Sequence, residues 1–536
     1  MQRQELLEKM KTGETFDLLV IGGGATGCGA ALDAASRGLR VALVEKGDFA
    51  SGTSSRSTKL VHGGVRYLEA AVLHLDGVQF NLVRDALHER GILLRIAPHL
   101  CHPLPLVTPI YRLAEVPYLL SGLKLYDLLA GAAGLGASRL LGHDEAVRSF
   151  PMIRKEGLRA GVLYFDGQFD DARMNVALAL TALAEGAAVA NYVEVVGLYR
   201  EQGRVAGATV RDRIGGGTWD IRARVVVNAT GPFADQVRAL DDPAAEPILS
   251  VSSGAHIVLN RRFAPPEAGI MIPRTDDGRL LFVLPWHGRC LVGTTDAPAQ
   301  VTDHPAVGPE EIEYLLRHLR RYFSLEVEPT DIAASWAGLR PLVGDPDRSD
   351  TAKLARDHAI NIASSGLITI SGGKWTTYRK MAQDTVDRAI QEGGLAAAPC
   401  RTETLPLHGA AEFVPGEEPS LAQRYGLAAE VATHLQQSYG DRAVQVVEIC
   451  AGNLGDRLVS DYPYLKGEIV YAARHELAVR AVDFLARRIP LALLDRKAAQ
   501  AAAPVVLELM AGELGWDLAR QEEEREEVQA RLVGML

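Results

Sequence analysis

Residues 16–45 carry the pattern that most constrains the fold of this chain. The apolar run FDLLVIG at 16–22 predicts a buried strand, and the glycine-rich sequence GGGATG follows it at 22–27. Small residues at helical spacing continue to Gly38, and RVALVE at 40–45 predicts the next strand. A strand, a glycine turn, a helix and a second strand together predict the start of a parallel nucleotide-binding sheet.

The glycine turn has the spacing that a dinucleotide requires. Gly22, Gly24 and Gly27 stand in G-x-G-x-x-G register, which allows a tight turn, close approach of a pyrophosphate and close packing of the helix. The N-terminus of that helix offers unpaired N–H groups and a positive dipole to the pyrophosphate. Glu45 ends the second strand, where a carboxylate can accept from a ribose hydroxyl, and this favours FAD or NAD over NADP.

The rest of the chain favours a flavin over a nicotinamide. The winding breaks at TSSRSTKLVHGG, residues 53–64, and a strand followed by a glycine turn returns only at 219–231 and 367–390. Between these returns, 280–286 and 289–296 predict a pair of strands. We therefore expect an α/β fold with a discontinuous FAD-binding Rossmann-like domain and an inserted antiparallel substrate domain. The amino-acid-oxidase-like and glutathione-reductase-like flavoproteins have this organisation.

Changes in composition predict the domain boundaries. The oxidoreductase region is expected over 1–395, a linker over 396–419, and a helical C-terminal domain over 420–536, where strand-like patterns vanish. Within the first region, FAD-binding pieces are expected at about 14–95, 155–235 and 340–395, and substrate-binding pieces at about 96–154 and 236–339.

Composition limits the partners and the compartment. A net charge of −10 argues against nucleic-acid binding. The five cysteines are scattered without a C-x-x-C motif, which suits a reducing compartment and predicts no metal site. The N-terminus lacks the features of a signal peptide, and no apolar run reaches the length of a membrane-spanning helix. We expect a cytoplasmic protein, with a homodimer as its candidate assembly.

One segment indicates contact with a membrane surface. VPYLLSGLKLYDLLAGAAG at 116–134 has a broad apolar face and a narrow polar stripe formed by Ser121, Lys124 and Asp127. Such a helix suits peripheral attachment to the cytoplasmic face of the inner membrane. Burial inside the protein is the alternative, since the segment lacks the usual enrichment in Lys and Arg.

Several segments resemble the FAD-dependent glycerol-3-phosphate dehydrogenases, the respiratory type that passes electrons to quinone. The resemblance runs in order through 16–69, APHL, VVVNATGP, GAHIV, LPW, VGTTD, GLRPL, ARDHAI and SGGKWTTYRK, and YPYLKGEIVYAARHE at 462–476 resembles the family's C-terminal domain. Its most specific part is STKLVHGGVRYLE. The resemblance implies that FAD accepts a hydride from sn-glycerol 3-phosphate, giving dihydroxyacetone phosphate, and that a membrane quinone receives the electrons.

The resemblance also implies roles for individual residues. Arg66, Arg340 and Arg356 would line the substrate pocket and bind the phosphate, since a guanidinium suits bidentate contact with phosphate. Lys374 would lie near the flavin and the substrate, and His256 is the candidate general base. The residues expected to bind FAD are Gly22, Gly24, Ala25, Thr26, Gly27, Glu45, Thr53, Ser54, Ser55, Thr58, His62, Gly63, Gly64, Ala229, Gly231, Gly373, Lys374 and Thr376.

The sequence departs from the family pattern at one position, and it leaves three alternative functions open. Where the family often has Lys-Gly-Ser-His, this chain has Ser253-Gly254-Ala255-His256, so a cation beside the proposed base is lost. A glycerophosphate oxidase would pass the electrons to oxygen instead. An amino-acid or amine oxidase would share the fold, although the cluster of cations favours a phosphate. A redox sensor would bind flavin without turnover.

Overall fold

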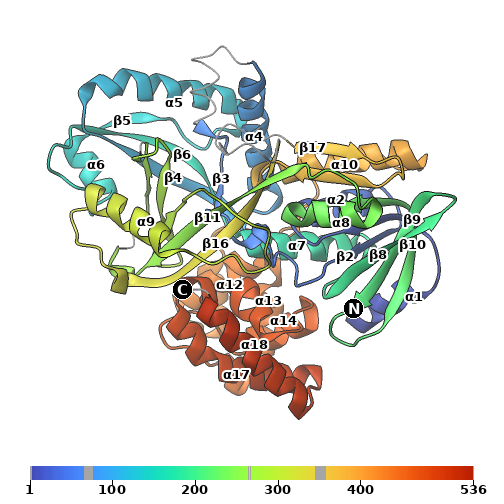
Figure 1. Ribbon diagram of the computed structural model, residues 1–536. Coiled ribbons are helices and arrows are strands. Elements are labelled where there is room, and N and C mark those ends of the chain that lie inside the picture. The colour runs from blue at the N-terminus through green and yellow to red at the C-terminus, as the bar shows by residue number, and fades with distance from the viewer. Residues whose placement is uncertain are drawn as a thin grey trace.

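The computed structural model describes residues 3–65, 77–263, 265, 267–273, 275–344 and 358–534. Two sheets lie side by side above a C-terminal helical domain (Figure 1). In the described part of the chain the first sheet has eight strands and the second has ten. The expected α/β class, with its inserted sheet domain and helical tail, is confirmed.

The first sheet is built on the strand, turn and helix that begin the chain. β1 (Phe16–Ile21) runs parallel to β2 (Val41–Val44) and to β10 (Thr218–Asn228), and α2 (Ala25–Ser36) connects β1 to β2. β18 (Ile368–Gly372) lies parallel to β10. The two later strands predicted from their glycine turns therefore return to the sheet that the glycine fingerprint begins.

Shorter elements complete this sheet and cover it. The edge strands are β7 (Ala188–Ala190) and β17 (His358–Ile362), and β8 (Val193–Glu201) and β9 (Arg204–Asp212) extend β10 as an antiparallel ribbon. The helices of this part are α1 (Arg3–Lys11), α7 (Asp171–Ala184), α8 (Ala234–Asp241) and α10 (Tyr378–Gly393). Helix α2 packs against α7 and against α10, and residues of all three helices share an apolar core with β1.

The second sheet is mostly antiparallel. Its long strands are β4 (Cys101–Ile110), β6 (Ala160–Phe169), β11 (Leu249–Leu259) and β16 (Ile332–Val343). Its shorter strands are β3 (Leu60–Val61), β5 (Arg139–Gly142), β12 (Gly269–Ile272), β13 (Leu281–Trp286), β14 (Arg289–Gly293) and β15 (Ala297–Pro298). The predicted pairing of 280–286 with 289–296 is confirmed by the register of β13 and β14. The piece at 155–235 begins with β6, which pairs with β4 in this second sheet.

Helices cover the second sheet and build the C-terminal domain. Around the sheet lie α4 (Gly77–Ile96), α5 (Val116–Ala130), α6 (His143–Ser149) and α9 (Pro309–Tyr322). The C-terminal helices are α11 (Glu418–Tyr425), α12 (Ala429–Tyr439), α13 (Ala443–Ile449), α14 (Gly467–His475), α15 (Ala481–Asp483), α16 (Leu491–Leu494), α17 (Arg496–Leu514) and α18 (Leu518–Gly534). Within the described ranges, no helix combines the length and the apolar character needed to cross a bilayer.

Buried ion pairs hold the C-terminal domain against the first sheet. The carboxylate of Asp48, just after β2, lies 2.5 Å from Arg487 and 2.6 Å from Arg488. Glu476 lies 2.7 Å from Arg173 of α7 in the same way. Burial alone would raise the pKa of Asp48, but Arg488 and Arg487 outweigh it and lower that pKa to about 2. The interface therefore depends on complete pairing of its charges, because an unpaired buried charge is costly.

We expect Asp48→Asn to lower the free energy of unfolding by about 3–5 kcal/mol, because two buried guanidinium groups would lose their shared carboxylate. The pKa of Asp48 lies below its ordinary value, so this stabilisation is complete at neutral pH. It is lost as the pH falls from about 4 toward about 2. Urea unfolding of the wild type and the variant across that range measures the loss. The exposed Asp85→Asn is the control and should change stability by less than about 0.5 kcal/mol. Equal effects of the two substitutions would contradict this account of the interface.

Candidate active site

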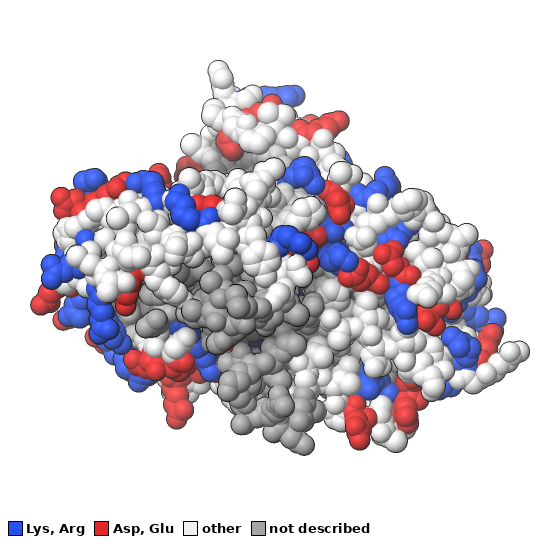
Figure 2. All heavy atoms as spheres, turned by 90° about the horizontal axis from the view of Figure 1, so that it is seen from above, with Lys and Arg blue, Asp and Glu red and all other residues white. Residues whose placement is uncertain are grey.

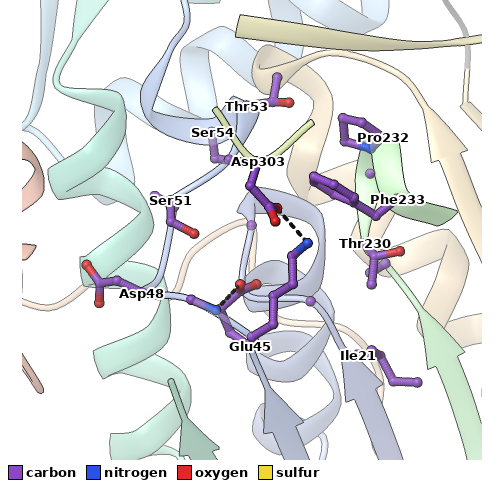
Figure 3. A pocket seen from close by; sticks show the side chains of 18 of the residues that line it. Ile21, Glu45, Asp48, Ser51, Thr53, Ser54, Thr230, Pro232, Phe233 and Asp303 are labelled. Carbon is purple, nitrogen blue, oxygen red and sulfur yellow. Dashed lines mark hydrogen bonds and ion pairs between the residues drawn. The ribbon is translucent and has the colours of Figure 1, made fainter. Parts of the chain in front are cut away.

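A cavity of about 820 Å³ opens at the carboxyl ends of β1 and β2, beside the N-terminus of α2. Figure 3 shows its walls, with Ile21 at the end of β1, Glu45 directly after β2, and Thr53 and Ser54 farther along the same segment. Residues of β16 and of α18 also line it. Parts of both sheets and of the C-terminal domain therefore meet around one space.

Most of the residues expected to bind the cofactor line this cavity. They are Gly22, Gly24, Ala25, Thr26, Glu45, Thr53, Ser54, Ala229, Gly231, Gly373 and Lys374. The others are not among the residues that line it: Gly27, Ser55, Thr58, His62, Gly63, Gly64 and Thr376. Among the described residues, no group of His, Cys, Asp and Glu side chains is arranged to hold a metal ion.

The glycine turn leaves no room for side chains. Gly22 has a φ of +110°, and a Cβ there would lie 2.7 Å from the carbonyl oxygen of Ala229. A Cβ on Gly27 would lie 1.9 Å from the carbonyl oxygen of Gly22, so α2 packs directly on the turn. At Gly24 the nearest atom to such a Cβ is the Ser54 hydroxyl, at 3.0 Å. The first and last glycines are thus needed for backbone packing, and Gly24 faces the cavity.

The polar side chains around the glycine turn form hydrogen bonds with backbone groups of neighbouring segments. Glu45 accepts from the N–H of Gly23 at 2.6 Å and from the N–H of Gly47 at 2.8 Å, and burial raises its pKa. The Ser54 hydroxyl accepts from the N–H of Ala25 at 2.9 Å, in the first turn of α2. The Thr53 hydroxyl donates to the carbonyl of Leu339 at 2.6 Å. These side chains fix the positions of the loops around the cavity.

Residues 53–59 run between the cavity and the face of the second sheet. Gly254 of β11 and Gly338 of β16 are cross-strand partners, and a Cβ on Gly338 would lie 2.9 Å from the Cβ of Arg56. On one side of this glycine pair lies His256, the partner of Trp336, and on the other lies Arg340. The sheet therefore brings the candidate base and one candidate phosphate ligand to the same face.

His256 is held in a fixed orientation. Its ring stacks on Trp336 with the centroids 5.2 Å apart, and its Nε2 lies 2.9 Å from the Thr58 hydroxyl. Burial, followed by the charges of Arg340 and Lys59, lowers the pKa of His256 well below its ordinary value. The imidazole is therefore neutral at neutral pH, which is the form that accepts a proton. Neither His256 nor Thr58 lines the cavity, and the Thr58 hydroxyl is the hydrogen-bond partner of His256 Nε2.

Arg340 lies over Gly254, where a Cβ would be 2.1 Å from its Nη2. Its guanidinium donates to the carbonyl oxygens of Ser253 at 3.2 Å and Thr295 at 3.0 Å, and its Nη1 lies 3.3 Å from the carboxylate of Asp296. A phosphate at this position would compete with that carboxylate for the arginine.

The register of β11 shows what the replacement of the family's usual lysine by Ser253 does to the site. Successive side chains of a strand point to opposite faces, so residue 253 points away from the face that carries Gly254 and His256. A lysine at 253 would therefore not lie directly beside the imidazole. The main contribution of Ser253 to this site is its carbonyl, which accepts from Arg340.

Several contacts were not foreseen from the sequence. The N–H of Gly63 donates to the hydroxyl of Tyr126 in α5 at 2.7 Å, and Tyr126 donates to Asp166 at 2.8 Å. Lys46 and Asp303 both line the cavity and pair at 2.6 Å; the dashed line at Asp303 in Figure 3 marks an ion pair. The position of Lys46 after Glu45 was a usable signal, but nothing in the sequence connected Asp303 to this site. Arg66 and Arg356 lie outside the described residues.

Comparisons with known proteins agree with this architecture. Residues 17–379 match the family model described as FAD dependent oxidoreductase, and residues 400–521 match the C-terminal domain of alpha-glycerophosphate oxidase. The chain is 48% identical to the mitochondrial glycerol-3-phosphate dehydrogenase of Mus musculus, over 98% of this chain and 74% of that protein. It is 45% identical to the Arabidopsis thaliana enzyme of the same name, over 95% of this chain and 85% of that protein.

This chain belongs to the FAD-dependent glycerol-3-phosphate dehydrogenase family. A solved structure of the Bacillus halodurans glycerol-3-phosphate dehydrogenase complexed with FAD superposes with a TM-score of 0.81 and 31% identity, covering 99% of this chain and 97% of that one. The cofactor is accordingly FAD. The cavity fits it, because the glycine turn at 22–27 excludes side chains from the place where a pyrophosphate would meet the N-terminus of α2.

We expect Gly24→Leu to yield colourless protein, because its side chain would occupy the position of the pyrophosphate. Gly27→Ala should instead lower the yield of folded protein, since its Cβ would collide with the carbonyl of Gly22. Flavin absorbance per protein and the melting temperature separate the two effects. The exposed Gly512→Leu, which would meet nothing nearby, is the control. A fully yellow Gly24→Leu protein would contradict this placement of the cofactor.

Proposed function

We propose that this protein oxidises sn-glycerol 3-phosphate to dihydroxyacetone phosphate. The observation that carries the proposal is 48% identity, over nearly the whole chain, to enzymes named for this reaction. The site adds chemical support, because a neutral, buried histidine and an arginine lie on one sheet face beside the cofactor cavity. The first is suited to accept a proton, and the second is suited to hold a phosphate.

The reaction divides between the cofactor and the chain. Bound FAD supplies the acceptor for the hydride that leaves C2 of the alcohol. His256 accepts the hydroxyl proton at Nε2, the atom that now faces Thr58. The substrate hydroxyl either displaces the Thr58 hydroxyl or uses it as a relay. The alcohol thereby loses one hydride and one proton and becomes a ketone.

The phosphate of the substrate is assigned to the cations around the site. Arg340 is held by the carbonyls of Ser253 and Thr295, which orients its fork before substrate arrives. An incoming dianion replaces Asp296 as the anionic partner of that fork. Lys374 lines the cavity directly after the Gly372–Gly373 turn and is assigned to the flavin and substrate end.

We assign the electrons to a membrane quinone. Oxygen is the second candidate acceptor, because residues 400–521 match a domain named for alpha-glycerophosphate oxidase. Measuring quinone reduction and hydrogen peroxide side by side, with the same substrate, separates the two. Stoichiometric peroxide without quinone reduction would make the protein an oxidase.

A quinone acceptor requires approach to a bilayer, and α5 is the proposed contact. Leu123, Tyr126 and Ala130 of α5 are buried against the second sheet, whereas the Leu128 side chain is 75% exposed and that of Tyr118 is 42% exposed. Among the described residues on the face seen in Figure 2, charges of both signs are scattered without one continuous basic patch. Attachment would therefore rest on apolar insertion more than on attraction to anionic lipid.

Anaerobic addition of glycerol 3-phosphate to the yellow protein tests the proposed reaction. We expect the flavin absorbance to bleach, with one dihydroxyacetone phosphate formed for each flavin reduced. Glycerol without the phosphate is the control and should bleach far more slowly. An unchanged spectrum, with the protein still reducible by dithionite, would favour a flavin-binding sensor.

Substitutions at two residues separate phosphate binding from proton removal. Arg340→Met should cost about 3–5 kcal/mol of transition-state binding and raise the substrate concentration needed for half-maximal reduction, with the FAD content unchanged. Arg340→Lys should recover part of the loss, since it keeps the charge without the fork. His256→Ala should slow flavin reduction by roughly 10²–10⁴ while substrate still binds.

The pH dependence gives a further check on His256. Because its pKa is lowered, the accepting form persists below the ordinary pKa of histidine. The wild-type rate of reduction should therefore stay level as the pH falls through about 6.5 and drop only at lower pH. Anaerobic stopped-flow reduction measures all of these quantities. If Arg340→Met shows unchanged substrate dependence, Arg340 is not a phosphate ligand.

Flotation with liposomes tests the contact through α5. We expect the wild type to rise with the vesicles, and Leu128→Glu to weaken this binding because it places a charge on the inserted face. Leu518→Glu changes a leucine on α18 that is at least as exposed and should float like the wild type. Wild-type protein that stays wholly at the bottom of the gradient would count against membrane attachment.

A further inference from the structure

Arg56 is unusual among the cations that line the cavity. Lys46 pairs with Asp303, Arg487 with Asp48, and Arg531 with Glu527. Arg480 pairs with two glutamates of α18 in the same way. With the residues that the structure describes, the side chain of Arg56 forms neither a hydrogen bond nor an ion pair.

The surroundings of Arg56 make its isolation costly. Burial, followed by the charges of Arg487 and Arg531, lowers the pKa of Arg56 to about 10, and Asp303 offsets this only in part. Arg56 is half-buried, and a guanidinium that loses part of its hydration without gaining a partner destabilises the protein; the neighbouring cations add to this cost. A negative charge brought into the cavity would relieve both effects.

The backbone holds Arg56 at a defined place in the cavity wall. Its N–H donates to the carbonyl of Thr53 at 3.0 Å, and its backbone lies on Gly338 of β16. Ser54, two residues earlier, contacts the first turn of α2. Arg56 therefore projects from a rigid segment that already borders the site of the cofactor.

We propose that Arg56 is the counter-charge to the anionic oxygens of bound FAD. This inference deepens the proposed function and rests on the part of it that concerns FAD. It does not depend on which alcohol is oxidised. FAD carries anionic oxygens on its pyrophosphate, and its ring system gains negative charge when it is reduced. Arg56 pairs either with the pyrophosphate or with the reduced ring. The two pairings have different effects on the FAD affinity and on the midpoint potential.

The experiment uses full-length protein with Arg56→Gln, Arg56→Lys and a control, Arg148→Gln, which removes the same charge from an exposed position on α6. Three quantities are measured without glycerol 3-phosphate: the melting temperature of the apoprotein, the Kd for FAD, and the midpoint potential against reference dyes. These three quantities do not depend on glycerol 3-phosphate, so they stay the same if the protein acts on a different substrate.

We expect Arg56→Gln to weaken FAD binding by roughly tenfold to a hundredfold, since hydrogen bonds to charged groups have about this strength. Arg56→Lys should recover most of the affinity, and Arg148→Gln should match the wild type. The apoprotein of Arg56→Gln should melt no lower than the wild type, because the lost cation has no partner among the described residues.

The midpoint potential then shows which anionic group of FAD pairs with Arg56. Equal weakening for oxidised and reduced FAD, with an unchanged potential, assigns Arg56 to the pyrophosphate. Weakening confined to the reduced form lowers the two-electron potential by about 30–60 mV and assigns Arg56 to the ring. The proposal is overturned if affinity and potential both stay within twofold of the control. It is also overturned if the apoprotein loses as much stability as the holoprotein, since Arg56 would then be structural.

Discussion

Gly338 has no side chain, and a Cβ there would lie 2.9 Å from both the Cβ and the carbonyl oxygen of Arg56. Because of this, residues 53–59 can lie directly on β16, with the cavity on one side and the face of the second sheet on the other. Thr53 and Ser54 then border the cavity, and Thr58 reaches His256. A bulkier residue at 338 would separate the nucleotide sheet from the groups assigned to the substrate.

The C-terminal domain contributes to the same site through charge. Asp48, which lies three residues after Glu45 in the cavity wall, is shared by Arg487 and Arg488 of that domain. Residues of α18 line the cavity near Asp303, a residue of the loop between β15 and α9. Because these pairs are buried, the helical domain is held in one position relative to the cavity. The domain is thus part of the cofactor's surroundings as well as a separate helical unit.

The features that could be predicted from the sequence are those encoded within a few neighbouring residues. The turn at 22–27 needs glycines because their own backbones are in contact, and that requirement is visible in the spacing. The pairing of β13 with β14 follows from two short runs joined by a tight turn. The membership of β6 could not be read in this way, because an apolar strand carries no mark of the sheet that it joins.

The sequence by itself determined the nucleotide-binding turn, the type of cofactor and the residues eligible for chemistry, because spacing and residue type decide these locally. Only the tertiary structure decided which partner each eligible residue has. Arg340 lies beside the carboxylate of Asp296, whereas Arg56 lies near the cations Arg487 and Arg531. The sequence neighbours of the two arginines, serines for Arg56 and Leu339 for Arg340, do not reveal this difference. His256 is neutral because folding buries it against Trp336 and near two cations. Electrostatic energies depend on distance and burial in space, and neither is contained in the order of the residues.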